Sequence, residues 1–272
     1  MIDIHTHTNL SAFDDDADAV IRRSLDAAVR MINVGTQIET SRRAIELADL
    51  YPDGVYATVG LHPTHTSASF HDKDESHGDH DSDPGEVFDM QTYKILAQHP
   101  KVIAIGECGL DYYRDPTDDE VKKQIEVFEQ HITLANEVGK PLMMHLRSGK
   151  RGNAYKDAWE IVKREAKVSG DSHFFAGSLE DARRFWDMGF ATSFTGVLTF
   201  THDYDAVVTA APKELIHAET DAPYATPKSY RGQRNEPLYV REVVKRMAEL
   251  RGVTLDEWEV QLTQNAQTLF GI

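Results

Sequence analysis

The sequence contains only one cysteine, Cys108, so no disulfide can form within the chain. This composition suits a reducing compartment, and we expect a cytoplasmic protein. The sequence also lacks any apolar run near the roughly 18–20 residues that span a bilayer. Its first residues lack the basic segment followed by an apolar one that is typical of a signal peptide. We therefore expect no association with a membrane.

Positive charge is scarce as well. The chain has 29 Lys and Arg against 45 Asp and Glu, a formal net charge of −16 at pH 7. Such a surface repels phosphates, which argues against a general nucleic-acid-binding protein and permits nucleic-acid chemistry only where positive charge is concentrated. Acids gather most densely at 71–89, where eight carboxylates and three histidines surround the single Lys73. We interpret about 66–86 as an acidic, His-rich surface insertion.

Short apolar runs alternate with amphipathic stretches along most of the chain. Strands are expected at 1–7, 31–35, 55–63, 102–107, 141–145, 171–175, 190–194 and 215–221. Helices are expected at about 14–29, 40–50, 118–138, 237–250 and 255–269. Eight strands alternating with helices predict an α/β protein with a (β/α)8 TIM barrel, forming one domain over 1–272. A doubly wound parallel sheet is the alternative.

The first expected strand ends in two histidines one residue apart, His5 and His7. Alternate side chains of a strand point to the same face, so both imidazoles can reach one ion. Neutral imidazoles that converge in this way bind divalent metals well. The short pattern by itself fits two polar residues on a frayed terminus equally well.

Other histidines and carboxylates occupy matching positions. The residues at or next to the C-terminal ends of expected strands are His5, His7, His62, Glu107, His145, His173 and Asp221. A barrel gathers these ends on one face, where the following loops build an active site. Packing alone does not explain seven such residues on one rim, so the sequence predicts a functional site there.

This set of imidazoles and carboxylates suits Zn²⁺, Mn²⁺ or Mg²⁺ and exceeds what one catalytic ion takes from a protein. We therefore expect two divalent ions per chain. One is assigned to His5, His7 and Asp221, the other to His145 and His173, with Glu107 as the bridge. Two ions about 3.5–4 Å apart can hold a shared hydroxide and the charged oxygens of a phosphodiester. Asp221, as an expected proton acceptor, and Glu107 are the expected catalytic residues.

Longer strings occur in an order that is typical of one family. They are Ile2-Asp3-Ile4-His5-Thr6-His7, Val59-Gly60-Leu61-His62-Pro63, Ala104-Ile105-Gly106-Glu107-Cys108-Gly109-Leu110-Asp111-Tyr112-Tyr113, His145-Leu146-Arg147, His173-Phe174-Phe175-Ala176-Gly177, Glu219-Thr220-Asp221-Ala222-Pro223-Tyr224 and Arg231-Gly232-Gln233-Arg234-Asn235-Glu236-Pro237. With these strings the chain resembles the TatD family of metal-dependent hydrolases, in the amidohydrolase-like barrel superfamily. The resemblance implies a two-metal barrel hydrolase with metal roles at the six residues assigned above. Characterised members are mostly deoxyribonucleases, many of which trim DNA from the 3′ end.

Three segments depart from the family's pattern. Residues 148–153 intervene where Asp-Ala usually follows His-x-Arg, Phe174-Phe175-Ala176-Gly177 replaces Cys-Phe-Ser-Gly, and the acidic insertion follows His62-Pro63. None of them removes an expected metal ligand. All three lie in loops that are expected to touch substrate, so substrate identity is the property that they leave open.

Substrate contacts are expected from four residues. Arg147 and Arg234 are the leading candidates for phosphate, because a guanidinium fork matches phosphate oxygens. His62 and Tyr112 complete the set, and a tyrosine at the rim can stack on an unpaired base. The expected partner is DNA, with RNA or aminoacyl-tRNA as alternatives, and no protein partner is indicated.

Three functions remain open at this point. The favoured hypothesis is a metal-dependent nuclease that acts as a 3′-5′ exonuclease on single-stranded or fraying DNA ends.

 The second is a metal-dependent deacylase or other ester or amide hydrolase, for example on aminoacyl-tRNA, in which the same hydroxide attacks a carbonyl. The third is a catalytically silent metal-binding protein. The complete set of expected ligands argues against the third, because a scaffold has no need of an open, charged site.

Overall fold

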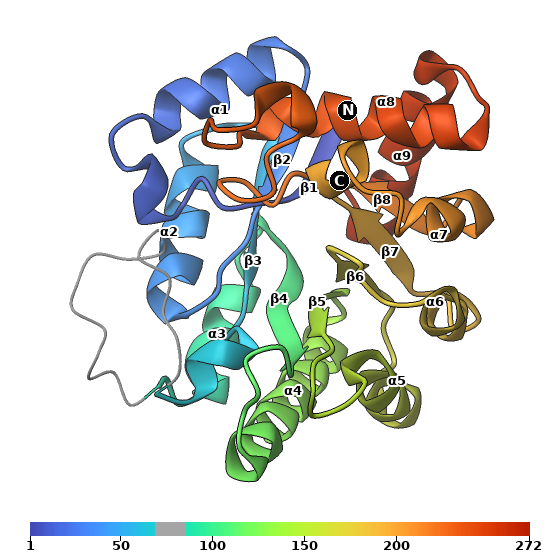
Figure 1. The fold of residues 1–272 in the computed structure, drawn as a ribbon. Helices are drawn as coiled ribbons and strands as arrows, with labels where there is room; N and C mark the ends of the chain where they lie inside the picture. The colour runs from blue at the N-terminus through green and yellow to red at the C-terminus, as the bar shows by residue number, and fades with distance from the viewer. Residues whose placement is uncertain (69–84) are drawn as a thin grey trace.

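The computed structural model describes residues 1–68 and 85–272. Its eight strands are parallel and pair in chain order. They are β1 (Ile2–Thr6), β2 (Arg30–Asn33), β3 (Val55–Val59), β4 (Val102–Asp111), β5 (Leu142–Arg147), β6 (Gly170–His173), β7 (Ala191–Phe194) and β8 (Ile216–Ala218). The strands occupy the centre of the molecule and the helices surround them (Figure 1). The predicted (β/α)8 barrel is therefore confirmed.

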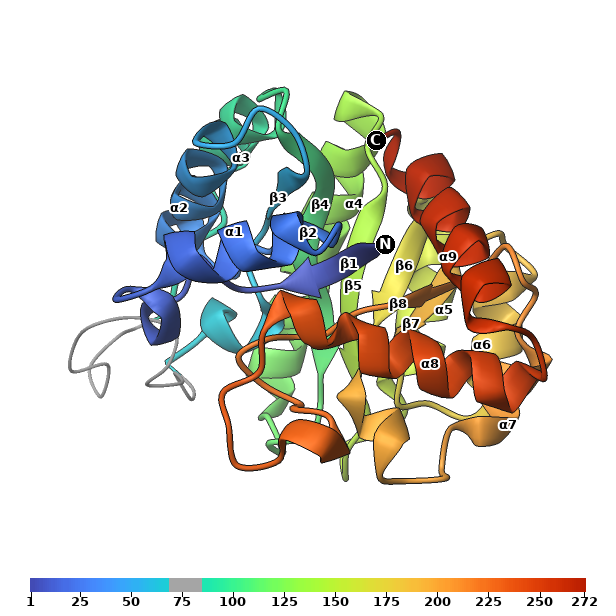
Figure 2. The same cartoon turned by 90° about the horizontal axis from the view of Figure 1, so that it is seen from above.

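The helices follow the strands around the outside. They are α1 (Ala17–Asp26), α2 (Ile38–Asp49), α3 (Met90–Ala97), α4 (Asp118–Val138), α5 (Ala154–Glu165), α6 (Leu179–Trp186), α7 (Asp205–Ala210), α8 (Val240–Arg251) and α9 (Leu255–Phe270). Short 3₁₀ turns lie at Ser11–Phe13, Pro63–Thr66, Gly196–Thr199, Lys228–Tyr230 and Pro237–Tyr239. At the chain start, β1 lies beside α9 (Figure 2). The amino group of Met1 there lies 3.5 Å from a carboxylate oxygen of Glu259 on α9.

Backbone hydrogen bonds join the last strand region to the first. The amide of Asp221 donates to the carbonyl of His5 at 2.9 Å, and the amide of His7 donates to the carbonyl of Ala222 at 2.8 Å. These bonds lie just beyond the end of β8. They fix His5, His7 and Asp221 relative to one another, so the closure of the barrel itself positions three expected metal ligands.

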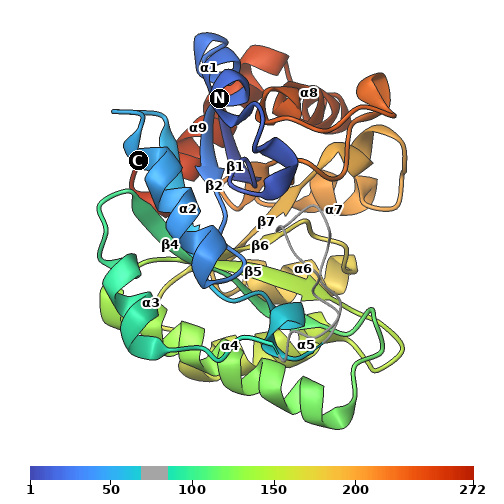
Figure 3. The same cartoon turned by 90° about the vertical axis from the view of Figure 1, so that its left-hand side faces the viewer.

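Helix α4 illustrates how the sequence builds the outer layer. Thr117 caps its start in a capping box with Glu120, and Gly139 ends it with a φ of 67°. Both signals are those expected at helix ends. Phe128 and Ile132 are fully buried on its inner face, where the helix packs against β4 and lies beside α3 and α5 (Figure 3). Burial of each such side chain contributes about 1.5–3 kcal/mol.

Several element ends differ from the sequence prediction. β4 continues to Asp111, whereas β8 ends at Ala218, and three residues later Asp221 adopts a φ of 55°. The first helix starts only at Ala17, after a 3₁₀ turn. The expected insertion at about 66–86 falls mostly on 69–84, outside the described residues, and the single-domain organisation stays a prediction. In the described part of the chain, no helix is long and apolar enough to cross a membrane.

Candidate metal centre

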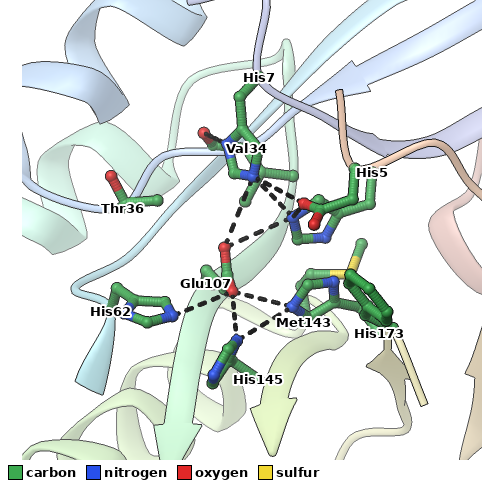
Figure 4. Close-up of polar contacts among 12 residues, drawn as sticks. His5, His7, Val34, Thr36, His62, Glu107, Met143, His145 and His173 are labelled. Carbon is green, nitrogen blue, oxygen red and sulfur yellow. Dashed lines mark hydrogen bonds and ion pairs between the residues drawn. The ribbon is translucent and has the colours of Figure 1, made fainter. Parts of the chain in front are cut away.

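The six expected ligands converge at one end of the barrel. His5 lies in β1, Glu107 in β4, His145 in β5 and His173 at the end of β6, while His7 and Asp221 follow β1 and β8. Figure 4 shows the imidazoles arranged around the carboxylate of Glu107. His5, His7, Glu107 and His173 are each at most 3% exposed. Residues far apart in the chain thus meet in a buried, polar cluster.

The two oxygens of Glu107 face different groups of imidazoles. Oε2 lies 3.4 Å from Nε2 of His5 and 3.8 Å from Nε2 of His7. Oε1 lies 2.9 Å from Nδ1 of His145 and 2.8 Å from Nε2 of His173. One carboxylate therefore stands between two sets of nitrogen atoms, as expected of a bridging ligand.

Asp221 completes the first set. Its Oδ1 lies 3.3 Å from Nε2 of His7 and 3.7 Å from Nε2 of His5. The two imidazole nitrogens are only 3.0 Å apart. Two nitrogens that each lie about 2.1 Å from one ion, at roughly a right angle, are separated by about 3 Å. The residues present therefore fit a divalent metal ion.

His62 also belongs to this cluster. Its Nε2 lies 3.3 Å from Oε1 of Glu107, nearly as close as the nitrogens of His145 and His173. His62, Glu107 and His145 bring their ligand atoms within 4.8 Å of one another. The sequence predicted a substrate contact at His62, and the geometry places its ring as a third nitrogen donor on this side of Glu107.

The imidazoles of the cluster differ in their affinity for protons. Burial, followed by repulsion from His173, lowers the pKa of His5 to about 3. Burial also opposes a charge on His7, but its hydrogen bond to Asp221 and the nearby carboxylates raise its pKa to about 9. For His145, burial is outweighed by hydrogen bonds to Asp111 and Glu107, and the pKa rises to about 10. Protons therefore occupy positions that a metal would take.

Glu107 remains a carboxylate despite its burial. Burial favours its neutral form, but the charges of His173 and His62 and the hydrogen bonds from His145 and His173 hold its pKa well below the usual range. An ionised, buried oxygen donor is suited to a hard or borderline divalent cation.

Asp111 contacts the cluster, although sequence reasoning did not assign it to the site. Its Oδ2 lies 3.0 Å from Nε2 of His145, the ring nitrogen that does not face Glu107. A carboxylate on the far nitrogen orients a ligating imidazole and raises its basicity. Asp111 shares strand parity with Glu107, and this alternation within β4 is the signal that could have found it.

A second buried carboxylate ties the first ligands together. Asp3 accepts hydrogen bonds from the amides of His5 at 3.3 Å and Thr220 at 2.8 Å, and from the hydroxyl of Thr220. These hydrogen bonds fix the backbone of His5 and of Thr220, the residue that precedes Asp221. Two expected ligands, His5 and Asp221, are thereby held in place relative to each other. Burial, partly offset by these hydrogen bonds, raises the pKa of Asp3 to about 8.

Glu219 precedes Asp221 by two residues and lies deeper in the barrel. It is fully buried and accepts hydrogen bonds from the amide of Phe174 and from the hydroxyl of Ser193. Phe174 directly follows the expected ligand His173 and adopts a φ of 44°. Glu219 therefore holds the backbone turn that begins just after His173. Burial and the negative charges of Asp171 and Asp221 raise the pKa of Glu219 well above its usual value.

Close backbone packing explains the glycine of the Glu-Cys-Gly string. Gly109 has a φ of 141°, and a Cβ atom there would lie 2.1 Å from the carbonyl oxygen of His145. Any other side chain would push β4 away from β5 and separate Glu107 from His145. Cys108 points the other way, into the apolar cluster around the barrel.

A cavity of about 490 Å³ opens over the cluster. Of the four expected substrate contacts, His62 and Arg147 line it. Arg234 and Tyr112 are not among its lining residues. Arg234 instead donates to the carbonyl of Ala12 and to Asp16, while the buried Tyr112 donates its hydroxyl to Asp157. The apolar and acidic surroundings of these two side chains, which the sequence does not reveal, hold them away from the cavity.

Comparisons with known proteins agree with this geometry. The family model described as TatD related DNase matches residues 2–271. The chain is 37% identical to the uncharacterized metal-dependent hydrolase YabD of Bacillus subtilis (strain 168), over 100% of this chain and 99% of that protein. It is 30% identical to the 3′-5′ ssDNA/RNA exonuclease TatD of Pantoea vagans, over 99% of each chain.

A solved structure matches the fold over its whole length. YJJV, a TatD homolog from Escherichia coli K12, superposes with a TM-score of 0.82 at 27% identity, covering 100% of this chain and 98% of the other. The family match and the relatives at 30% identity or more extend over essentially the entire sequence. The chain therefore belongs to the TatD family of metal-dependent hydrolases, within the amidohydrolase-like superfamily.

Proposed function

We propose that this protein is a divalent-metal-dependent deoxyribonuclease that hydrolyses phosphodiester bonds from the 3′ end of single-stranded or fraying DNA. The observation that carries the proposal is the position of Glu107, whose two oxygens face two sets of imidazole nitrogens. This arrangement supports a two-metal site on the floor of a cavity. The exonuclease name of the Pantoea relative supports the choice of substrate.

Some residues of the chain would bind metal, and others position those ligands. The six residues His5, His7, Glu107, His145, His173 and Asp221 would hold two divalent ions, Zn²⁺, Mn²⁺ or Mg²⁺, with Glu107 positioned to contribute to both. When bound, such ions lower the pKa of water and neutralise charge on a phosphodiester. Asp111 orients His145 through their 3.0 Å contact, and Asp3 and Glu219 hold the backbone around His5 and His173.

Asp221 is proposed to accept the proton of the attacking water. It lies beside the cavity, is 8% exposed, and directs Oδ1 toward Nε2 of His7. Arg147 lines the same cavity and is proposed to bind a phosphate oxygen with its guanidinium. His62, beside Glu107, is proposed to contact the reacting phosphate group or to supply a further nitrogen to the second ion.

The experiment that tests this function uses single-stranded DNA labelled separately at its 3′ and 5′ ends. Purified protein and the Glu107→Ala variant are incubated with each DNA while Mg²⁺, Mn²⁺ or Zn²⁺ is supplied singly. Metal-dependent, stepwise loss of nucleotides from the 3′ end by the wild type alone is expected. Hydrolysis of aminoacyl-tRNA under the same conditions, with DNA left intact, would replace the nuclease with the deacylase.

A further inference from the structure

An exposed aromatic ring and an arginine form a stacked pair beside the cavity. Cζ of Arg147 lies 3.7 Å from the ring centroid of Tyr113. Tyr113 is 58% exposed, so most of its ring surface is accessible to solvent. Arg147 lines the cavity over the expected metal ligands, whereas Tyr113 lies next to it and outside the lining. The pair therefore lies at the rim of the cavity, farther from the barrel interior than the expected metal ligands.

The backbone holds this pair in a fixed position. Asp111 and Arg147 are register partners at the ends of β4 and β5, and the amide of Tyr112 donates to the carbonyl of Arg147 at 2.8 Å. The amide of Tyr113 donates to Oδ1 of Asp111 at 2.8 Å. The other oxygen of Asp111 contacts His145. One carboxylate thus links the position of Tyr113 to an expected metal ligand.

The segment that departs from the family's pattern packs directly against this pair. Gly149 and Gly152 exchange two backbone hydrogen bonds of 3.2 Å, which close residues 149–152 into a tight loop. A Cβ atom on Gly149 would lie 1.9 Å from the carbonyl oxygen of Tyr112 and 2.9 Å from Cα of Tyr113. The loop therefore supports the backbone from which Tyr113 projects. This support comes from residues 148–153, a segment in which the sequence departs from the family's pattern.

The charge of Arg147 is not neutralised within the described part of the chain. No ion pair or side-chain hydrogen bond joins its guanidinium to a described residue, and the ring of Tyr113 covers one of its faces. Other arginines behave differently: Arg234 pairs with Asp16, and Arg151 pairs with Asp118. Arg147 thus retains donors for an anion, while its stacking on an aromatic ring reduces the freedom that binding would otherwise remove.

We propose that Tyr113 and Arg147 form a nucleotide subsite at the rim, for one of the two nucleotides that flank the reacting phosphate. The guanidinium binds the phosphate of that nucleotide and the exposed ring of Tyr113 stacks on its base. The inference rests on the proposed nuclease function. Base stacking tolerates any sequence because every base has a π-face, and it requires an unpaired base. The ligand class is therefore an unpaired nucleotide in a strand, and not an isolated phosphodiester.

The test measures binding of short single-stranded oligonucleotides by fluorescence anisotropy with saturating Mg²⁺. The terminal linkages are phosphorothioates, which slow cleavage during the titration. One set carries every base, and a second set carries one abasic residue, placed in turn at each of the last four positions. The proteins are the wild type, Tyr113→Phe, which retains the ring, and Tyr113→Leu, which retains apolar bulk without the ring. Thermal melting and metal content report whether each variant is folded and loaded.

The expected result is position-specific. An abasic residue at one of the last two positions weakens wild-type binding at least about fivefold, because stacking contributes about 1–3 kcal/mol per base. Tyr113→Leu weakens binding of the complete oligonucleotide to a similar extent and removes the sensitivity to that abasic position. Tyr113→Phe binds like the wild type. A change in the backbone alone would instead weaken binding of every oligonucleotide equally.

Two outcomes overturn the subsite. One is that Tyr113→Leu binds the complete oligonucleotide as tightly as the wild type. The other is an equal loss in Tyr113→Leu for complete and abasic strands. The proposed function fails separately, if binding shows the expected dependence on ring and base but end-labelled DNA is never cleaved.

Discussion

Metal binding should expel protons from the site. In the metal-free cluster the pKa of His7 is about 9 and that of His145 about 10, so both imidazoles are charged at pH 7.5. His5, with a pKa of about 3, is already neutral. A ligating imidazole must give up the proton from the coordinating nitrogen. Loading both ions at pH 7.5 should therefore release at least two protons per chain.

The sign of the pH dependence follows from the same competition. Because both pKa values are raised, protons occupy the site at every pH below about 9, and metal affinity falls as the pH is lowered. One linked proton per ion corresponds to about a tenfold weaker affinity, or about 1.4 kcal/mol, for each pH unit below that pKa. Moving from pH 7.5 to 6.5 should thus raise the dissociation constant of each ion about tenfold.

Isothermal titration calorimetry in buffers of different ionisation enthalpy measures the released protons directly. Asp111→Asn is the matched variant, because the Asp111 hydrogen bond is the leading cause that raises the pKa of His145. This variant should release fewer protons while His7 still releases its own. Release of fewer than one proton by the wild type, or an affinity that is flat between pH 6.5 and 7.5, would refute the reasoning.

Three further predictions concern single side chains. Asp221→Asn should abolish most hydrolysis with little change in melting temperature, whereas Glu219→Gln should mainly lower stability or metal affinity. Turnover and thermal melting of both variants are measured under saturating metal. Near-normal turnover in Asp221→Asn would show that Asp221 takes no part in the reaction. Arg147→Ala should raise KM on DNA about 10- to 150-fold at full metal content, because a charge-assisted hydrogen bond contributes about 1.5–3 kcal/mol; unchanged KM would move phosphate binding elsewhere. Asp3→Ala should lower the free energy of unfolding by at least about 2 kcal/mol in urea titrations, because it leaves the buried amides of His5 and Thr220 without an acceptor; an unchanged midpoint would contradict this.

Strand alternation made much of the site predictable. His5 and His7 share a face, and Glu107, His145 and His173 lie in parallel strands whose C-terminal ends meet in a barrel. These positions follow from local periodicity and from one rule of topology. Glu219 could be placed below Asp221 for the same reason, although β8 itself is shorter than expected.

The tertiary partners of individual side chains were not accessible from the sequence. Arg147 and Arg234 look equivalent as basic residues in rim loops, yet Asp16 and the ring of Phe13 hold Arg234 away from the cavity lining. Tyr112 and Tyr113 are adjacent, but strand parity buries the first and exposes the second.

The central claim is that Glu107 joins two metal ions. Crystals grown with Mn²⁺ and measured at the manganese absorption edge locate each ion by its anomalous signal. We expect two peaks about 3.5–4 Å apart, one on each side of the Glu107 carboxylate, with His5, His7 and Asp221 around one and His145 and His173 around the other. A single peak, or a second peak held by residues away from Glu107, would contradict the account.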